Sequence, residues 1–148
     1  MRNLMKTALV MVALILTPLA ASADDGKMRL FVNLTTDDTW SAAKAIMFAH
    51  QKAHKNGHDA AIWLNVRGVY LADKKRPSNV PGLMAKDGTS IQNMLTAFIA
   101  DGGTVIMCSA CTKAAGLTEA DYIDGIVMGN TDLVAGWLFD ENTQTLAW

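Results

Sequence analysis

The 148-residue sequence contains only two cysteines, Cys108 and Cys111, and only three histidines and three prolines. Two cysteines cannot form the disulfide framework that stabilises many small secreted domains. A zinc site needs about four ligands, and no second Cys-x-x-Cys or histidine pair lies at a suitable spacing near these thiols. Any thiol chemistry in this protein therefore depends on these two residues.

Several common catalytic patterns are also missing. The sequence has no G-x-x-x-x-G-K-[ST] phosphate-binding loop, no G-x-S-x-G nucleophile motif and no paired-carboxylate constellation. Neither sign of charge dominates, because the chain carries 13 basic and 14 acidic residues. A balanced domain of this kind is not expected to bind nucleic acid, and no cofactor is predicted.

The longest apolar run is short, but the start of the chain resembles a secretory signal peptide. Arg2 and Lys6 precede the apolar stretch 8–20, and Ala21-Ser22-Ala23 supplies a small-x-small cleavage site. The stretch of about 13 residues is shorter than the roughly 20 that a membrane-spanning helix needs. We therefore expect export and cleavage after Ala23, with an uncleaved membrane anchor as the alternative.

Cleavage would leave one domain, 24–148, in the periplasm. These 125 residues carry 11 basic and 14 acidic side chains, and they suffice for a single sizeable core. No cysteine follows the cleavage site, so a lipid anchor is not expected. We expect no stable membrane association once the signal peptide is removed.

Short apolar runs alternate with helical patterns along 24–148. Strands are predicted at 29–34, 59–64, 104–107, 126–128 and 143–148. Helices are predicted at 40–54, 89–100 and 132–139, with a further helix from the Cys-x-x-Cys motif to Gly116 and a short turn at 118–121. This alternation predicts a single α/β domain with a mostly parallel sheet of about five strands and helices on both faces.

The segment 65–88 is irregular, with a helical turn expected at 69–72. Loops of this length inside small domains are usually functional or mobile. The segment carries the basic run Lys74-Lys75-Arg76, which either attracts an anionic donor or is simply solvated.

The cysteines lie where a predicted strand meets a predicted helix. Cys108 follows the apolar run 104–107 and opens the helix, so it faces the unpaired N–H groups of the first turn. Such donors favour the thiolate, the form in which a cysteine is nucleophilic. Cys108 is therefore the candidate nucleophile, and a small buried apolar residue is the alternative interpretation.

Cys111 lies one helical turn beyond Cys108. This spacing lets one thiol resolve a mixed disulfide on the other, and it also permits a permanent local disulfide with no turnover. Sequence reasoning leaves both possibilities open.

The histidines His50, His54 and His58 are spaced four apart, and the first two would share a helix face. His50 and His54 suit either a metal or, more simply, the negative end of the helix dipole.

The scattered methionines indicate core packing, and Trp40, Trp63 and Trp137 are expected in the core or at subunit contacts.

Four segments resemble a known family. They are an Asp/Thr-rich turn into an Ala-rich helix (34–49), Gly-His-Asp-Ala-Ala-Ile-Trp-Leu (57–64), Gly-Val-Tyr-Leu-Ala (68–72) and the cysteine-bearing segment 108–117. The sequence is similar to the DsrE/DsrF-like (TusD-like) family over nearly all of 24–148. The most specific element is a cysteine at a strand end, followed eight residues later by Gly116.

The resemblance implies a small α/β fold, assembly into homotrimers or hexamers, and a cysteine that carries sulfur as a persulfide. Cys108 matches that cysteine, and Cys111 matches a second one present in many members. The sulfur-relay members act in the cytoplasm, so the expected export sets this chain apart from them.

Three hypotheses follow for this chain. The first is an exported sulfur carrier or sulfurtransferase, in which Cys108 takes sulfur from a donor and passes it to the thiol of a partner protein, while Cys111 resolves or protects the persulfide. The second is a dithiol/disulfide redox protein that uses Cys108 and Cys111 as an electron couple. The third is a non-catalytic oligomeric binding module in which the cysteines only pack.

Overall fold

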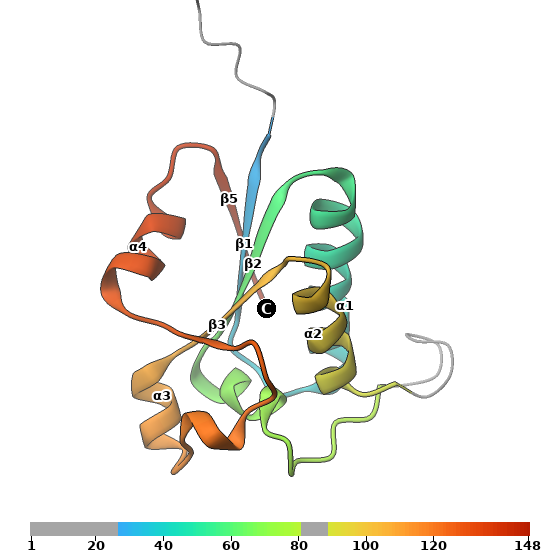
Figure 1. Cartoon of the computed structure of the whole chain (residues 1–148), viewed down its shortest axis with the longest axis vertical. Coiled ribbons are helices and arrows are strands. Elements are labelled where there is room, and N and C mark those ends of the chain that lie inside the picture. The colour runs from blue at the N-terminus through green and yellow to red at the C-terminus, as the bar shows by residue number, and fades with distance from the viewer. Residues whose placement is uncertain (1–26, 81–88) are drawn as a thin grey trace, which may run out of the picture.

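A computed structural model describes residues 27–80 and 89–148, which form one five-stranded sheet between helices (Figure 1). The strand order is β4-β3-β2-β1-β5, and every neighbouring pair is parallel. The predicted α/β architecture is therefore confirmed. The predicted signal peptide, 1–23, lies outside the described residues, as does 81–88.

The strands occupy the apolar runs that the sequence indicates. Their bounds are β1 (Arg29–Leu34), β2 (Asp59–Leu64), β3 (Thr104–Met107), β4 (Val127–Met128) and β5 (Thr143–Ala147). The first three strands start and end where the sequence predicts. They are also the best buried, whereas β5 lies at the sheet edge and is largely exposed.

Helices cover both faces of the sheet. The α-helices are α1 (Thr39–Met47), α2 (Ile91–Ala100), α3 (Ser109–Ala114) and α4 (Thr131–Leu138). The shorter helical segments are η1 (Phe48–Ala53), η2 (His54–Asn56), η3 (Val66–Ala72) and η4 (Glu119–Asp121). Figure 1 shows α1 and α2 together on one face and α4 on the other.

The core divides between these two faces because side chains alternate along a strand. In β1, Val32 and Leu34 belong to the larger cluster with α1 and α2. Phe31 belongs to a smaller cluster with Trp137 of α4. This alternation also places Trp63 of β2 on the α4 side, where its ring stacks on Phe31 at a centroid distance of 6.0 Å.

Side-chain caps fix where the helices begin. Asp38 accepts a hydrogen bond from the Ser41 N–H at 2.8 Å and starts α1, as the Asp/Thr-rich turn predicts. Ser90 and Asn130 cap α2 and α4 in the same way. These local hydrogen bonds fix the residue at which each of the three helices begins.

The predicted helix 40–54 is not uniform. Regular α-helix ends at Met47, and a π-helix and a 3₁₀ turn continue the coil to Asn56. Gly57 then ends it with a left-handed φ of 87°, which glycine adopts without steric cost.

The carboxyl ends of β1, β2 and β3 meet at the lower end of the molecule in Figure 1. The segment after β2 and the helix α3 both lie there, because parallel strands finish at the same edge. Within 27–80 and 89–148, no helix is long and apolar enough to cross a membrane.

Candidate functional site

Cys108 lies between β3 and α3, half-buried, as the sequence predicts. Its backbone N–H donates to the Leu64 carbonyl at 3.0 Å, which extends the pairing of β3 with β2 by one residue. Its Sγ accepts a hydrogen bond from the Cys111 N–H at 3.2 Å, so the thiol is itself the N-cap of α3. One strand and one helix thus fix the position of this sulfur.

Cys111 lies in the first turn of α3 and points towards the segment after β2. Its thiol donates to Asn65 Oδ1 at 3.1 Å, and its Sγ accepts from the Val66 N–H at 3.3 Å. Cys108 and Cys111 are both free thiols in the structure. Each cysteine thus receives a backbone N–H, from a different segment of the chain.

Sequence reasoning missed Asn65 and Val66. Asn65 directly follows β2, the neighbour of β3, and parallel pairing brings the ends of these two strands together. The predicted order of the strands could therefore have placed Asn65 beside Cys111. Nothing in the sequence indicates Val66, because it contacts Cys111 through a backbone N–H, which every residue except proline has.

Val66 has an unusual backbone conformation. Its φ is 50°, and it is the only non-glycine residue with positive φ among residues 27–80 and 89–148. A β-branched residue rarely adopts this region, because its side chain crowds the backbone. Such strain is concentrated at functional sites in proteins, and here it accompanies the N–H that contacts Cys111.

A buried hydrogen-bond chain supports the first turn of α3. The Tyr122 hydroxyl donates to Thr112 Oγ1 at 2.9 Å, and Thr112 Oγ1 donates to the Cys108 carbonyl at 2.9 Å. Tyr122 is only 1% exposed and Thr112 only 3%. The residue that carries the thiol is therefore held by the segment that follows η4.

The thiolate bias expected for Cys108 is wrong. Burial raises the pKa of the Cys108 thiol above its ordinary value, and the adjacent Cys111 thiol raises it further, while the N–H of Cys111 acts in the opposite direction. Burial is the largest of these effects, so the N–H groups of Cys111 and Ala110 in the first turn of α3 offset only part of it. Cys108 is thus held mainly as a thiol at neutral pH.

A hollow of about 350 Å³ opens beside Cys108, between the start of α3 and the start of α4. We call it the Cys108 cavity, and its lining residues are Trp63, Cys108, Ser109, Ala110, Gly129, Asn130, Thr131 and Val134.

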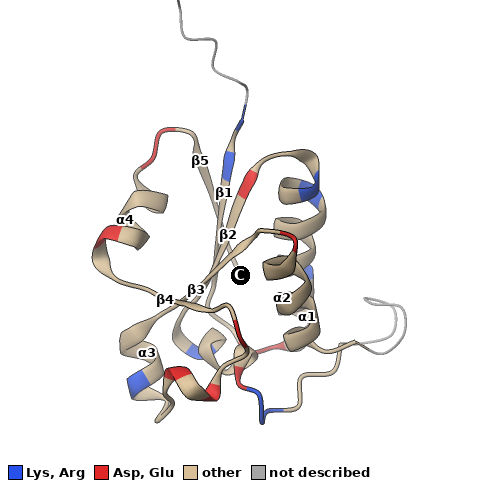
Figure 2. Cartoon of the chain, viewed as in Figure 1, with Lys and Arg blue, Asp and Glu red and all other residues tan. Residues whose placement is uncertain are grey.

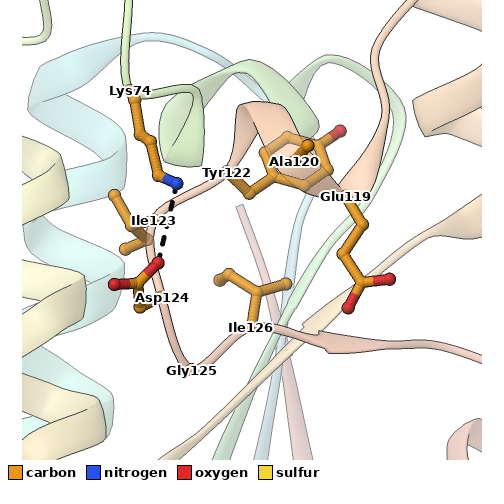
Figure 3. Close-up of a pocket in the computed structure, with 8 residues that line it drawn as sticks. All are labelled: Lys74, Glu119, Ala120, Tyr122, Ile123, Asp124, Gly125 and Ile126. Carbon is orange, nitrogen blue, oxygen red and sulfur yellow. Dashed lines mark ion pairs between the residues drawn. The ribbon is translucent and has the colours of Figure 1, made fainter.

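A larger hollow of about 550 Å³ lies beside η4, and no cysteine lines it (Figure 3). It is bordered by the Lys74–Asp124 ion pair, at 3.6 Å.

The basic run 74–76 is paired with carboxylates. Lys74 and Lys75 contact Asp124 and Asp121, and Figure 2 shows the blue run at the lower end of the molecule beside red residues. Arg76 binds Asp37 after β1.

Asp37 is shared between two arginines, since Arg67 also binds it at 2.7 Å. The two guanidinium groups hold the pKa of the Asp37 carboxyl far below its ordinary value. This cluster ties the end of β1 to the segment that follows β2, and so to the backbone beside Cys111.

His50 and His54 are brought together at the end of α2, whereas His58 lies apart and its Nδ1 accepts a hydrogen bond from the Met28 N–H at 3.2 Å. His50 Nε2 lies 2.5 Å from Asp101 Oδ2, and His54 Nε2 lies 2.7 Å from the Asp101 carbonyl. In the part of the chain that the structure describes, no group of three or more His, Cys, Asp or Glu residues is placed to hold a metal ion. His50 and His54 instead connect η1 and η2 to the residue that follows α2.

The profile of the DsrE/DsrF-like family matches residues 28–142. The chain belongs to the DsrE/DsrF-like family. The match includes β1, the carboxyl edge of the sheet and both cysteines.

Two archaeal proteins are similar in sequence. The uncharacterized protein MK0008 of Methanopyrus kandleri is 30% identical over 83 residues, which cover 55% of this chain and 62% of that protein. The uncharacterized protein MJ0989 of Methanocaldococcus jannaschii is 35% identical over 96 residues, covering 64% and 76%.

Two solved structures share the fold. The ychN protein from E. coli has a TM-score of 0.65 and 19% identity, over 82% of this chain and 99% of that one. MTH1491 from Methanobacterium thermoautotrophicum has a TM-score of 0.64 and 11% identity, over 82% and 100%. At these identities the likeness shows the DsrE-like fold alone.

Proposed function

We propose that this DsrE/DsrF-like protein carries sulfane sulfur as a persulfide on Cys108. The observation that supports this most is the position of the Cys108 sulfur. It lies at the carboxyl end of a central strand, it receives the N–H of Cys111, and it borders an open cavity. The family resemblance points to the same residue, since Cys108 matches the sulfur-carrying cysteine.

The loading step uses a persulfide donor, R–S–SH. The Cys108 thiolate attacks the outer sulfur, a new Sγ–S bond forms, the donor's S–S bond breaks, and RS⁻ leaves. The proton lost by Cys108 goes to solvent and is available to the leaving thiolate. Transfer to an acceptor thiolate repeats the exchange and returns Cys108 to its starting form.

The raised pKa of Cys108 fits a carrier that reacts only with an activated donor. At neutral pH the free thiol is mostly protonated, so it reacts slowly with chance electrophiles. The N–H of Cys111 is already aimed at the sulfur and would stabilise the anion when it forms.

Cys111 would act on the loaded form. Its thiolate would attack the Cys108 sulfur of the persulfide, giving a Cys108–Cys111 disulfide and releasing hydrosulfide. The contacts with Asn65 and Val66 hold the Cys111 thiol one helical turn away until that step occurs.

Intact-mass measurement tests this assignment. Wild type, Cys108→Ser and Cys111→Ser are incubated with a persulfide donor and weighed. We expect Cys111→Ser to gain one sulfur atom and keep it, and Cys108→Ser to gain none. The wild type should gain one sulfur atom and then lose it as the Cys108–Cys111 disulfide forms. The opposite pattern would reverse the two roles, and no gain in any protein would contradict the carrier.

A second candidate function is a dithiol/disulfide couple, favoured by the single-turn separation of the two thiols in α3. The reduction potential separates the two functions. A pair that cycles near the potential of its compartment would support the redox couple. A pair that resists reduction would be a structural disulfide.

We also propose that the protein is exported to the periplasm, works there as a homotrimer or hexamer, and passes its sulfur to a protein thiol. The signal-like sequence of 1–23 supports export. Fractionation of cells with N-terminal sequencing, and light scattering of the purified protein, measure location and subunit number. Full-length protein in the cytoplasm, or a monomer, would contradict these proposals.

A further inference from the structure

We infer that the Cys108 cavity binds the sulfur donor, and that the donor is a small organic persulfide whose body is apolar and carries no charge. This inference rests on the proposed function, because it names the substrate class of the same thiol.

The size and position of the Cys108 cavity suit a small molecule. Its volume of about 350 Å³ lies at the lower end of the range of small-ligand sites. Cys108 is one of the residues that line it, so a bound donor lies beside the nucleophile.

The charge of the lining selects the class of donor. None of the eight residues that line the Cys108 cavity is Lys, Arg, Asp or Glu. An anionic donor such as thiosulfate would lose hydration there without gaining a cation. Where basic residues do line a hollow, at 74–76, that hollow contains no cysteine.

The walls are apolar and held in place before any ligand arrives. The indole ring of Trp63 is stacked on Phe31, which in turn stacks on Trp137 at 6.1 Å. Val134 of α4 packs against the same cluster. A flat or aliphatic ligand body therefore meets a wall that does not need to reorganise.

The polar groups of the cavity also fix its shape. Ser109 Oγ donates to the Gly129 carbonyl at 2.7 Å, which joins α3 to the turn after β4. The Trp63 Nε1–H is buried and finds no hydrogen-bond partner among the described residues.

The first test measures binding apart from sulfur transfer. Benzyl methyl sulfide has the apolar body but no sulfur to give, and its titration into the full domain is followed by the indole N–H signals in NMR. The blocking variant is Ala110→Trp, at an exposed lining position of α3. The matched control is Ala114→Trp, also exposed on α3 but outside the cavity. We expect Ala110→Trp to weaken binding about tenfold, equivalent to roughly 1.4 kcal/mol, and the control to bind as wild type.

The second test measures loading. Benzyl persulfide and inorganic polysulfide are offered to each protein, and the ratio of the two loading rates is compared. We expect Ala110→Trp to lower the ratio about tenfold relative to Ala114→Trp, because only the organic donor needs the cavity.

The outcomes distinguish the two proposals. If Cys108 loads but Ala110→Trp and Ala114→Trp behave alike, the donor site is wrong and the carrier function stands. If benzyl methyl sulfide does not bind to the wild type, the donor site is likewise wrong. If no donor loads Cys108, both proposals fail, even where the cavity binds the thioether.

Discussion

The strained backbone at Val66 makes a sharp prediction about stability. Its φ of 50° places a β-branched residue in the left-handed region, at a cost of about 1–2 kcal/mol. Asparagine tolerates this region, so Val66→Asn removes most of the cost. Val66 is 57% exposed, and replacing its side chain therefore removes only part of the burial of a valine.

Val66→Thr is the matched control. Threonine is also β-branched, so it keeps the strain, and it loses a similar amount of apolar surface. The difference in the free energy of unfolding between the Asn and Thr variants thus isolates the cost of the positive φ at residue 66. We expect Val66→Asn to be more stable than Val66→Thr by about 1–2 kcal/mol.

Urea unfolding followed by far-UV circular dichroism measures this difference. For an m-value of roughly 2 kcal/mol/M, the two midpoints are expected to differ by about 0.5–1 M. Val66→Gly is expected to gain less than Val66→Asn, because glycine adds entropy to the unfolded chain. Equal midpoints for the Asn and Thr variants would refute the claim that Val66 is strained.

Three further predictions concern the supports of the site. Tyr122→Phe removes a buried hydrogen bond to Thr112, and we expect it to destabilise the protein by about 1 kcal/mol in urea, so an unchanged midpoint would contradict that role. Asp37→Asn is expected to cost about 1–2 kcal/mol at neutral pH, since it removes a carboxylate shared by two arginines. Because the folded pKa of Asp37 is lowered, its contribution is complete above about pH 4 and is lost as the pH falls further, so wild type and Asp37→Asn should converge in acid. Parallel acid-unfolding curves would argue against this. In Cys111→Ser, the rate of Cys108 alkylation by iodoacetamide should rise with pH until well above the ordinary cysteine value of about 8.5, and a plateau at neutral pH would contradict the raised pKa.

Local sequence signals were enough for most of the fold. The strands β1, β2 and β3 are short apolar runs bounded by turn residues. Neighbouring residues in the sequence are therefore enough to indicate where each strand begins and ends. The caps at Asp38, Ser90 and Asn130 are equally local. For the same reason, the position of Cys108 at a strand–helix junction was predictable.

The rest of the site depends on contacts between distant segments. Cys111 and Asn65 are 46 residues apart, and no local pattern joins them. Tyr122 reaches Cys108 only through Thr112, and the Cys108 cavity needs the start of α4 beside α3. The pKa direction was wrong for a related reason, because the burial of the thiol is set by packing that the motif does not encode.

Site-resolved mass spectrometry tests the central claim most directly. Wild-type protein is alkylated at once after loading with a persulfide donor, before Cys111 can displace the added sulfur. Digestion with trypsin then releases 87–113 with both cysteines in one peptide. Fragmentation of that peptide then locates the added sulfur. The account predicts that it lies on Cys108 and that an acceptor thiol removes it. Added sulfur on Cys111, or a peptide that never gains sulfur, would contradict it.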